Sequence, residues 1–518
     1  MMEKLFNIAG PCIPGEHYML PALQRNPEIK SLIDKKQYFV IHAARQTGKT
    51  TLLKSLVKQL NDEGNYYALY CSLEAVQGIN EPKEGIAEII NNIKKSLYFE
   101  EVEAKDNFSK GVDKDEFTTS IYLSLAKFSQ ELGKPFVLLF DEADCLSNGT
   151  LITFLRQLRD GYVNRGNIPF VHSIALVGMR DIRDYKARIR EDRQTLGSAS
   201  PFNVITKSLT IGNFTESEVK ALYNQHTLAT AQEFEQAAID KAYFWTQGQP
   251  WLVNALAREC VEEILQNDYS KVITLNHIDQ AAENIMLRRD THIDSLLERL
   301  KEERVKKVIQ PVLLGTLDYN LTDDDTSYCL DLGIIKSQSG KLLPSNPIYK
   351  EIIVRTLTIT SQHQLEGLYP NIWIDDNGHL KLNELLQEFQ QFWRENSDVW
   401  VEKYQYKEAA PHLILQAFLQ RVINGGGHID REYATGKKRM DLCVHFNNQK
   451  YPVEIKLWYG EKTLSDGIEQ LSEYMDTLGE KTGWLVIFDR SAEKSWEEKI
   501  FWQEEKLLQE KAILVIGC

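Results

Sequence analysis

The sequence has 518 residues, of which 43% are hydrophobic and 26% charged, a composition typical of a globular protein of about two to four domains. Its net charge of −14 excludes a protein that coats nucleic acid with its whole surface, although a local basic patch is compatible with it. The seven cysteines are scattered without a C-x-x-C pair, and no apolar leader or membrane-length apolar run is present. We therefore expect a soluble, cytoplasmic protein without a zinc site or a disulfide framework.

Four short apolar segments alternate with helical segments in the first part of the chain. They lie at residues 37–43, 65–73, 135–144 and 173–181. Apolar strands that alternate with helices are typical of a parallel sheet covered on both faces. This part of the sequence therefore predicts an α/β fold.

The turn after the first of these strands fits a phosphate-binding loop. Residues 43–50 read AARQTGKT and match the pattern G-x-x-x-x-G-K-[ST], except that Ala43 replaces the first glycine. Gly48 permits close backbone approach, Lys49 is expected to reach the β- and γ-phosphates of ATP, and Thr50 to offer a hydroxyl to Mg²⁺. Alanine is compatible with position 43 where φ stays negative. The alternative is a chance GKT on a loop. The ATP-binding residues expected here are Ala44, Arg45, Gln46, Thr47, Gly48, Lys49, Thr50 and Thr51.

The third apolar segment ends in two acids, Asp141 and Glu142. In a phosphate-loop protein, an acid in the place of Asp141 holds Mg²⁺, and one in the place of Glu142 polarises the attacking water. This acidic pair and the strand–loop–helix context of the GKT triplet both favour a nucleotide site that hydrolyses ATP.

From about residue 214 the pattern is helical. The first helix opens with Thr215 and Glu218, the spacing of a capping box. Residues 333–346 read as a hairpin that turns at Gly340, and helices followed by a hairpin suggest a winged helix. Residues 358–397 resemble a helical connector, and the remaining chain is α/β again up to the apolar segment AILVIG.

A second chemical motif lies in this last part. The segments RMDLCVHF and YPVEIKLW flank Asn447 and Asn448, which predicts a β-hairpin that brings Asp441 near Glu454 and Lys456. Two carboxylates with a lysine beside them can hold Mg²⁺ and orient a water for attack on phosphorus. The alternative is an ordinary hairpin with a surface Glu–Lys pair.

The N-terminal motifs carry a family resemblance. The segments GPCIPGEHYMLP, YFVIHAARQTGKTT, FDEAD and GQPWLVNALA resemble the AAA-like ATPases related to the STAND and archaeal-ATPase branch of AAA+ proteins, over about residues 1–360. The resemblance implies an ATPase core at residues 1–212, a helical lid at 213–300, a winged helix at 301–360, and a tendency to form homo-oligomeric rings. It also implies that Pro250, in a G-x-P motif, lies near the nucleotide, although this turn equally fits a plain helix start.

The C-terminal motif resembles the PD-(D/E)xK nuclease superfamily, with Met440 in place of the usual proline. The resemblance implies a nuclease-like domain at residues 398–518, preceded by the connector at 361–397. It implies that Asp441, Glu454 and Glu432 bind metal, and that Lys456 and Gln470 join Asp441 and Glu454 as catalytic residues. The acid usual on the first helix of such domains is replaced by Gln416. The segment INGGGHIDREYATGKKRMDL further resembles nuclease domains fused to AAA-like ATPases.

Two functions follow from these motifs. The first is a nucleotide-regulated nuclease that uses ATP and Mg²⁺, with Mg²⁺ or Mn²⁺ at the nuclease site. It would cut nucleic acid, DNA in preference to RNA, in prokaryotic defence or the control of mobile elements. The second is a non-cutting ATPase switch or scaffold, whose nuclease-like domain only binds nucleic acid or a partner. Metal-dependent cleavage by the purified protein separates the two.

Overall fold

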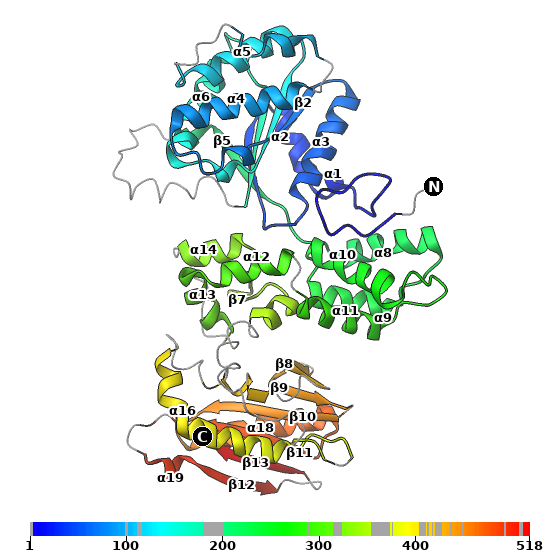
Figure 1. The fold of residues 1–518 in the computed structure, drawn as a ribbon, viewed down its shortest axis with the longest axis vertical. Helices are drawn as coiled ribbons and strands as arrows, with labels where there is room; N and C mark the ends of the chain where they lie inside the picture. The colour runs from blue at the N-terminus through cyan, green and yellow to red at the C-terminus, as the bar shows by residue number, and fades with distance from the viewer. Residues whose placement is uncertain are drawn as a thin grey trace. The chain divides into compact units, whose positions relative to one another are not determined.

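The computed structural model divides the chain into two compact units, residues 1–299 with 318–349 and residues 300–317 with 350–518, which are taken separately below (Figure 1). No helix in the described part is long and apolar enough to cross a membrane. The structure describes residues 4–98, 102–110, 116–179, 201–288, 291–313, 324–353, 373–375, 377–403, 411, 414–416, 418–419, 427–435, 438–447, 449–489, 491, 494–506 and 511–518.

A five-stranded parallel sheet forms the centre of the first unit, in the order β2-β3-β4-β1-β5. Its central strands are buried throughout, because helices cover both faces and leave no side for water. The predicted strands are all present, and β5 is an addition whose half-exposed pattern does not resemble an apolar run. The strands are β1 (Tyr38–His42), β2 (Tyr67–Ser72), β3 (Phe136–Asp141), β4 (Ser173–Gly178) and β5 (Ile205–Thr210).

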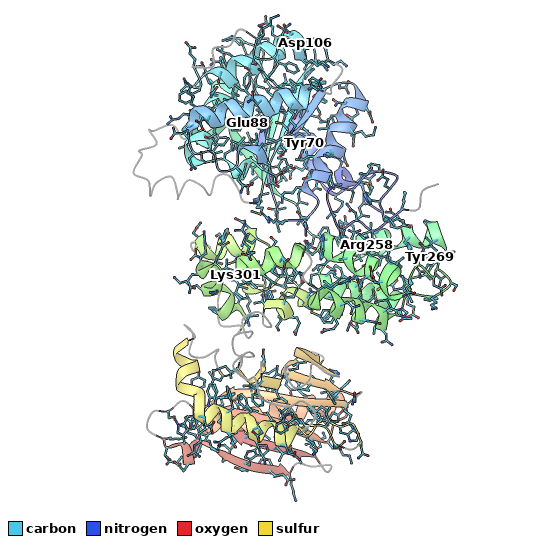
Figure 2. All side chains as sticks on the ribbon, in the orientation of Figure 1. Tyr70, Glu88, Asp106, Arg258, Tyr269 and Lys301 are labelled. Atoms are coloured by element: carbon cyan, nitrogen blue, oxygen red, sulfur yellow. The ribbon has the colours of Figure 1, made fainter. Side chains whose placement is uncertain are left out.

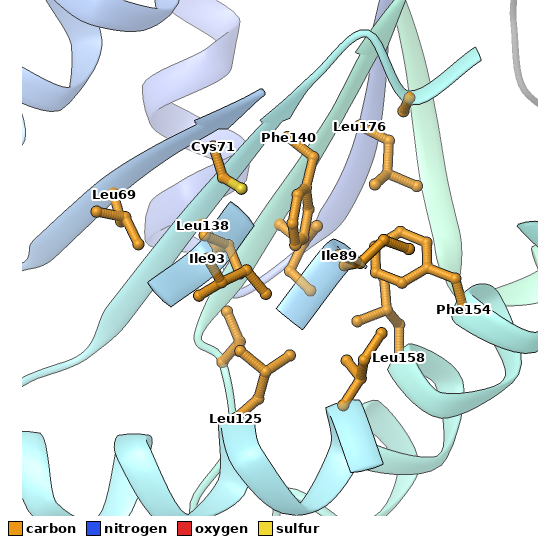
Figure 3. Close-up of a cluster of buried hydrophobic side chains, with 14 of the residues drawn as sticks. Leu69, Cys71, Ile89, Ile93, Leu125, Leu138, Phe140, Phe154, Leu158 and Leu176 are labelled. Carbon is orange, nitrogen blue, oxygen red and sulfur yellow. The ribbon is translucent and has the colours of Figure 1, made fainter. Parts of the chain in front are cut away.

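Two hydrophobic cores lie on the two faces of this sheet, since successive strand residues point to opposite sides. Leu138 and Phe140 of β3 join the core under α4, α5 and α6, shown in Figure 3. Val137 and Leu139 join the other core, with α2 and α3. The helices are α1 (Ala22–Arg25), α2 (Pro27–Asp34), α3 (Lys49–Glu63), α4 (Pro82–Tyr98), α5 (Ser120–Leu132) and α6 (Asn148–Asn164).

A group of helices follows the sheet in the first unit. The predicted capping box at Thr215 is present, with Glu218 Oε2 accepting from the Thr215 backbone N–H at 2.7 Å. The predicted hairpin is present as β6 (Ile335–Gln338) and β7 (Lys341–Pro344). The helices are α8 (Glu216–Thr230), α9 (Gln236–Thr246), α10 (Pro250–Arg258), α11 (Leu275–Leu287), α12 (Thr291–Leu300) and α14 (Asp324–Asp331).

The second unit contains a six-stranded mixed sheet in the order β12-β13-β11-β10-β9-β8. β10, β11 and β13 run parallel, whereas β8, β9 and β12 are antiparallel to their neighbours. The strands are β8 (Gly427–Thr435), β9 (Lys438–Phe446), β10 (Gln449–Leu457), β11 (Thr482–Phe488), β12 (Phe501–Lys506) and β13 (Ala512–Gly517), and the helices are α13 (Glu303–Leu313), α16 (Leu382–Lys403), α18 (Glu461–Leu478) and α19 (Trp496–Lys499).

The helix α16 corrects the expected connector at residues 361–397. Leu385, Leu386, Phe389 and Trp393 are buried in one core of the second unit, together with Phe488. α18 packs on a separate core formed by the alternate residues of the same strands. An amphipathic helix buried along one side is part of a folded body, so this unit begins before the expected boundary at residue 398. Residues 361–372 of the expected connector lie outside the described residues.

Candidate functional sites

The predicted phosphate loop lies between β1 and α3. Gly48 has φ of 91°, a left-handed conformation that favours glycine. Ala43 is not among the residues with positive φ, so alanine is compatible with this position, as the sequence analysis required. Gln46 has φ of 57° and holds a strained conformation within the same turn. The loop thus keeps its glycine at the position where the backbone needs one.

The side chain of Lys49 folds back onto the backbone of its own loop. Its Nζ donates hydrogen bonds to the carbonyl oxygens of Ala43 and Ala44, both at 2.9 Å. Burial lowers the pKa of Lys49, and the negative charges of Glu142 and Asp141 oppose that shift. The ammonium group is therefore buried beside uncharged acceptors, which phosphate oxygens can replace with stronger, charge-assisted hydrogen bonds.

Asp141 at the end of β3 faces the start of α3. Its Oδ2 accepts hydrogen bonds from Thr50 Oγ1 at 2.7 Å and from the Tyr70 hydroxyl at 3.0 Å. Its Oδ1 accepts from the backbone N–H of Glu142 at 3.0 Å. A buried carboxylate beside a threonine hydroxyl is a set of hard oxygen donors, which fits Mg²⁺ rather than a softer metal.

Glu142 follows Asp141 in a left-handed conformation, with φ of 56°. Burial, and then the charges of Asp141 and Asp144, raise the pKa of Glu142. A carboxylate with a raised pKa is a stronger base, which suits a group that takes a proton from water. Glu142 is therefore chemically suited to the role that its sequence position predicts.

A pocket of about 520 Å³ surrounds these groups, a volume within the range of small-molecule sites. Ala44 and Asp141 are not in its wall; they bond to Lys49 and Thr50, which are. The expected nucleotide-site residues that line the pocket are Arg45, Gln46, Thr47, Gly48, Lys49, Thr50, Thr51, Glu142 and Pro250.

Segments distant in sequence complete this pocket. The Cys12 backbone N–H donates to Thr51 Oγ1 at 3.0 Å, and Trp251 Nε1 donates to the Ile8 carbonyl at 2.8 Å. From α12, Ser295 Oγ accepts a hydrogen bond from Arg45 at 3.0 Å. None of these contacts was predictable from local sequence, because they join segments that are 39 to 250 residues apart. The segments GPCIPGEHYMLP and GQPWLVNALA, which contributed to the family resemblance, pointed to this region.

The second predicted site lies where β9 and β10 pair. Asp441 Oδ2 accepts from the backbone N–H of Ile455 at 2.9 Å, and the Asp441 backbone N–H donates to Glu454 Oε2 at 3.3 Å. Lys456 Nζ donates to Glu454 Oε1 at 2.6 Å and to Gln470 Oε1 on α18 at 2.9 Å. The β9–β10 hairpin therefore brings Asp441, Glu454 and Lys456 together, and α18 places Gln470 beside Lys456.

Glu454 is the most deeply buried charge of this group, with 0% of its surface exposed. Burial, and then the nearby charge of Asp441, raise the pKa of Glu454, while Lys456 opposes the shift. Gln470 is itself held, because its Nε2 donates to the Tyr474 hydroxyl at 2.7 Å. The alternative of a surface Glu–Lys pair does not describe a carboxylate that is fully buried.

Two further residues, Glu432 and Gln416, are expected near this site from the sequence. Glu432 lies on β8, but its side chain is outside the described residues. Gln416 lies in a helical segment, and its Oε1 is buried without a hydrogen-bond partner among the described residues. Within the described ranges, no group of three or more His, Cys, Asp or Glu side chains is arranged to hold a metal ion. The metal role of Glu432 therefore stays a prediction.

Comparisons with known proteins separate the two parts of the chain. A family model described as an AAA-like domain matches residues 23–354, well over half of the sequence. A second model, described as a domain of unknown function (DUF8371), matches residues 379–492. No curated protein matches the sequence.

Solved structures resemble the chain at low sequence identity. A Walker-type ATPase of Pyrococcus abyssi has a TM-score of 0.48 at 12% identity, over 67% of this chain and 99% of that one. The Aeropyrum pernix ORC1 protein, solved in complex with DNA, has a TM-score of 0.36 at 13% identity, over 67% and 96%. The Thermotoga maritima RuvB Holliday junction branch migration motor has a TM-score of 0.34 at 13% identity, over 64% and 92%.

Proposed function

Because the chain belongs to the AAA-like domain family, we propose that its first unit binds ATP with Mg²⁺ and hydrolyses it. The observation that carries this proposal is Lys49, whose buried ammonium group is bonded only to loop carbonyls at 2.9 Å among the contacts described. Phosphate oxygens would take the place of those carbonyls. The N–H groups of the loop and of the first turn of α3 would add further donors to the phosphates.

The roles of the other residues follow from their positions. Thr50 and Asp141 would hold Mg²⁺, which supplies charge neutralisation on the phosphates when bound. Glu142 would orient the attacking water and accept its proton. Arg45, Gln46, Thr47 and Thr51 line the pocket beside the phosphates, and Pro250 lines it from α10.

For the second unit we propose metal-dependent cleavage of a phosphodiester. The observation that supports it is the convergence of Asp441 and Glu454 with Lys456, which lies 2.6 Å from Glu454 and 2.9 Å from Gln470. Asp441 and Glu454, joined by Glu432, would hold Mg²⁺ or Mn²⁺, which supplies Lewis-acid activation. Lys456, positioned by Gln470, would stabilise the negative charge that develops on the phosphate.

The two proposals combine into a nucleotide-regulated nuclease of the PD-(D/E)xK kind. Its partner would be nucleic acid, DNA in preference to RNA, and its setting prokaryotic defence or control of mobile elements in the cytoplasm. We retain residues 1–212, 213–300 and 301–360 as the ATPase core, lid and winged helix, and place the start of the nuclease-like part before α16.

The test is cleavage of labelled single- and double-stranded DNA and RNA by the full chain, with Mg²⁺ or Mn²⁺ and with or without ATP. We expect cleavage by the wild type, none by Asp441→Ala, and normal cleavage by the matched control Asp466→Ala, whose exposed carboxylate lies on α18. ATP hydrolysis should be equal in all three. Absence of cleavage under every condition, with hydrolysis intact, would favour the non-cutting switch.

A further inference from the structure

Tyr70 lies next to the proposed metal site, on a strand that the motifs do not include. In the parallel pairing of β2 and β3, Tyr70 is opposite Leu139, two residues before Asp141. Since alternate residues share a face, Tyr70 and Asp141 point to the same side of the sheet, the side covered by α3. Figure 2 shows Tyr70 on β2 of the first unit.

The Tyr70 hydroxyl fills a defined place on the Asp141 carboxylate. An ionised carboxylate has about four acceptor positions. In this structure Thr50, Tyr70 and the Glu142 backbone N–H occupy three of them, at 2.7, 3.0 and 3.0 Å. Hydrogen bonds to both oxygens fix the rotation of the Asp141 carboxylate. They therefore also fix the direction of its fourth acceptor position, which is left for a metal ion.

The aromatic ring fixes the position of this hydroxyl. Tyr70 packs against the core between the sheet and α3, and Lys54 Nζ lies 5.7 Å from the ring centroid. Removal of the hydroxyl alone would leave that packing in place. The ring thus serves as a rigid support for one hydrogen bond to Asp141.

We propose that Tyr70 is a positioning residue that sets the Mg²⁺ affinity of the nucleotide site through Asp141, an inference that rests on the proposed ATP-binding function. Hydrogen bonds that orient a metal-binding side chain typically change metal affinity about 10- to 100-fold when they are removed. Tyr70 is not among the residues that line the pocket, so the affinity for nucleotide without metal should not depend on it.

The experiment compares wild type with Tyr70→Phe by titrating free Mg²⁺ at a fixed concentration of a fluorescent ATP analogue and following its binding. We expect the Mg²⁺ midpoint of Tyr70→Phe to rise about tenfold, with the affinity measured in EDTA unchanged. The matched control is Tyr66→Phe, since the Tyr66 hydroxyl also donates to an aspartate, Asp34, at 2.8 Å but lies outside the pocket. Formation of the Mg²⁺–analogue complex in solution is common to all variants and cancels in the ratio.

A second comparison tests whether the effect passes through Asp141. In an Asp141→Ala background, Tyr70→Phe should produce no further rise in the Mg²⁺ midpoint, because the acceptor of the Tyr70 hydrogen bond is then absent.

Three outcomes would count against the inference. An unchanged Mg²⁺ midpoint in Tyr70→Phe, with normal nucleotide binding by the wild type, overturns the inference about Tyr70 but not the proposed function. A lower Tm with an unchanged midpoint assigns Tyr70 a purely structural role and overturns it as well. Wild-type protein that binds no nucleotide overturns the proposed function, and this inference with it.

Discussion

The two proposed sites each place a lysine next to buried carboxylates, but the lysines are held differently. Lys49 in the first unit bonds to two uncharged carbonyl groups of its own loop. Lys456 in the second unit bonds directly to Glu454, which is fully buried. In the first unit it is the hydroxyls of Thr50 and Tyr70 that bond to the buried carboxylate of Asp141.

The two lysines therefore differ in which bonds they would give up when a ligand binds and in which group their removal would leave without a partner. Under the proposed function, Lys49 would exchange its two neutral carbonyl partners for phosphate oxygens. Lys456 balances a buried charge, so its removal leaves Glu454 without a counter-ion in a low-dielectric environment. The first lysine is therefore expected to matter for binding, and the second for both the chemistry and the stability of its unit.

The largest expected effect is the loss of nucleic-acid cleavage when the lysine of the second unit is removed. Lys456→Ala should reduce nucleic-acid cleavage by about a thousandfold, because the charge that stabilises the reacting phosphate is lost. Metal binding, measured by calorimetry with Mn²⁺, should be retained, since the lysine does not bind the metal. The control Lys462→Ala removes an exposed lysine at the start of α18 and should cleave normally. Equal cleavage by Lys456→Ala and wild type would show that the active site has been wrongly assigned.

The next largest effect concerns Glu142, the proposed general base of the ATPase site. Glu142→Gln should bind ATP as tightly as the wild type and hydrolyse it about a hundredfold more slowly, because general-base catalysis contributes about 10²- to 10⁴-fold. Single-turnover hydrolysis with labelled ATP measures this. Glu131→Gln, an exposed glutamate in α5, serves as the control. A hydrolysis rate equal to that of the wild type would remove Glu142 from the proposed role.

Lys49→Ala tests the first lysine itself. We expect ATP affinity to fall by about a hundredfold, corresponding to about 2.7 kcal/mol, the scale of charge-assisted hydrogen bonds. Fluorescence titration with an ATP analogue measures the affinity, and Lys58→Ala, on the exposed side of α3, should leave it unchanged. Unaltered affinity in Lys49→Ala would contradict the assignment of the loop.

The sequence predicted those parts of both sites whose residues lie within a short stretch of chain. A strand, a GKT triplet and a helix follow one another within residues 38–63, and the hairpin that joins Asp441 to Glu454 spans residues 438–457. The hydrophobic spacing of these segments determines the face on which each side chain lies. No knowledge of distant contacts was needed for them.

Features that depend on the pairing of distant segments could not be predicted from the sequence. β5 joins β1 from more than 150 residues away and has a mixed polar pattern, so it did not read as a strand. Tyr70 became a neighbour of Asp141 only through the order of the sheet, and the contact of Cys12 with Thr51 only through the path of the N-terminal segment. α16 was taken as a connector because the residues that bury its apolar side lie far along the chain.

The smallest predicted effect concerns a buried histidine of the nucleotide unit. Burial lowers the pKa of His292 to about 3, and its ring stacks on Trp251 at 4.5 Å. Its Nε2 bonds to the Tyr349 hydroxyl at 2.5 Å. Arg45 and Arg299 line the same small pocket as His292.

The sign of the resulting pH dependence follows from linkage. Below pH of about 6.5 the unfolded chain binds a proton at His292 that the folded unit does not, so stability falls as the pH falls, by at most about 1.4 kcal/mol per pH unit. We expect the calorimetric transition that shifts on addition of ATP to move down by about 2 °C between pH 6.5 and 5.5. The variant His292→Phe retains an aromatic ring against Trp251 but has no titrating group, so the part of the shift due to His292 should disappear. Parallel pH profiles of wild type and His292→Phe would show that the histidine gains a proton in the folded state, contrary to its burial.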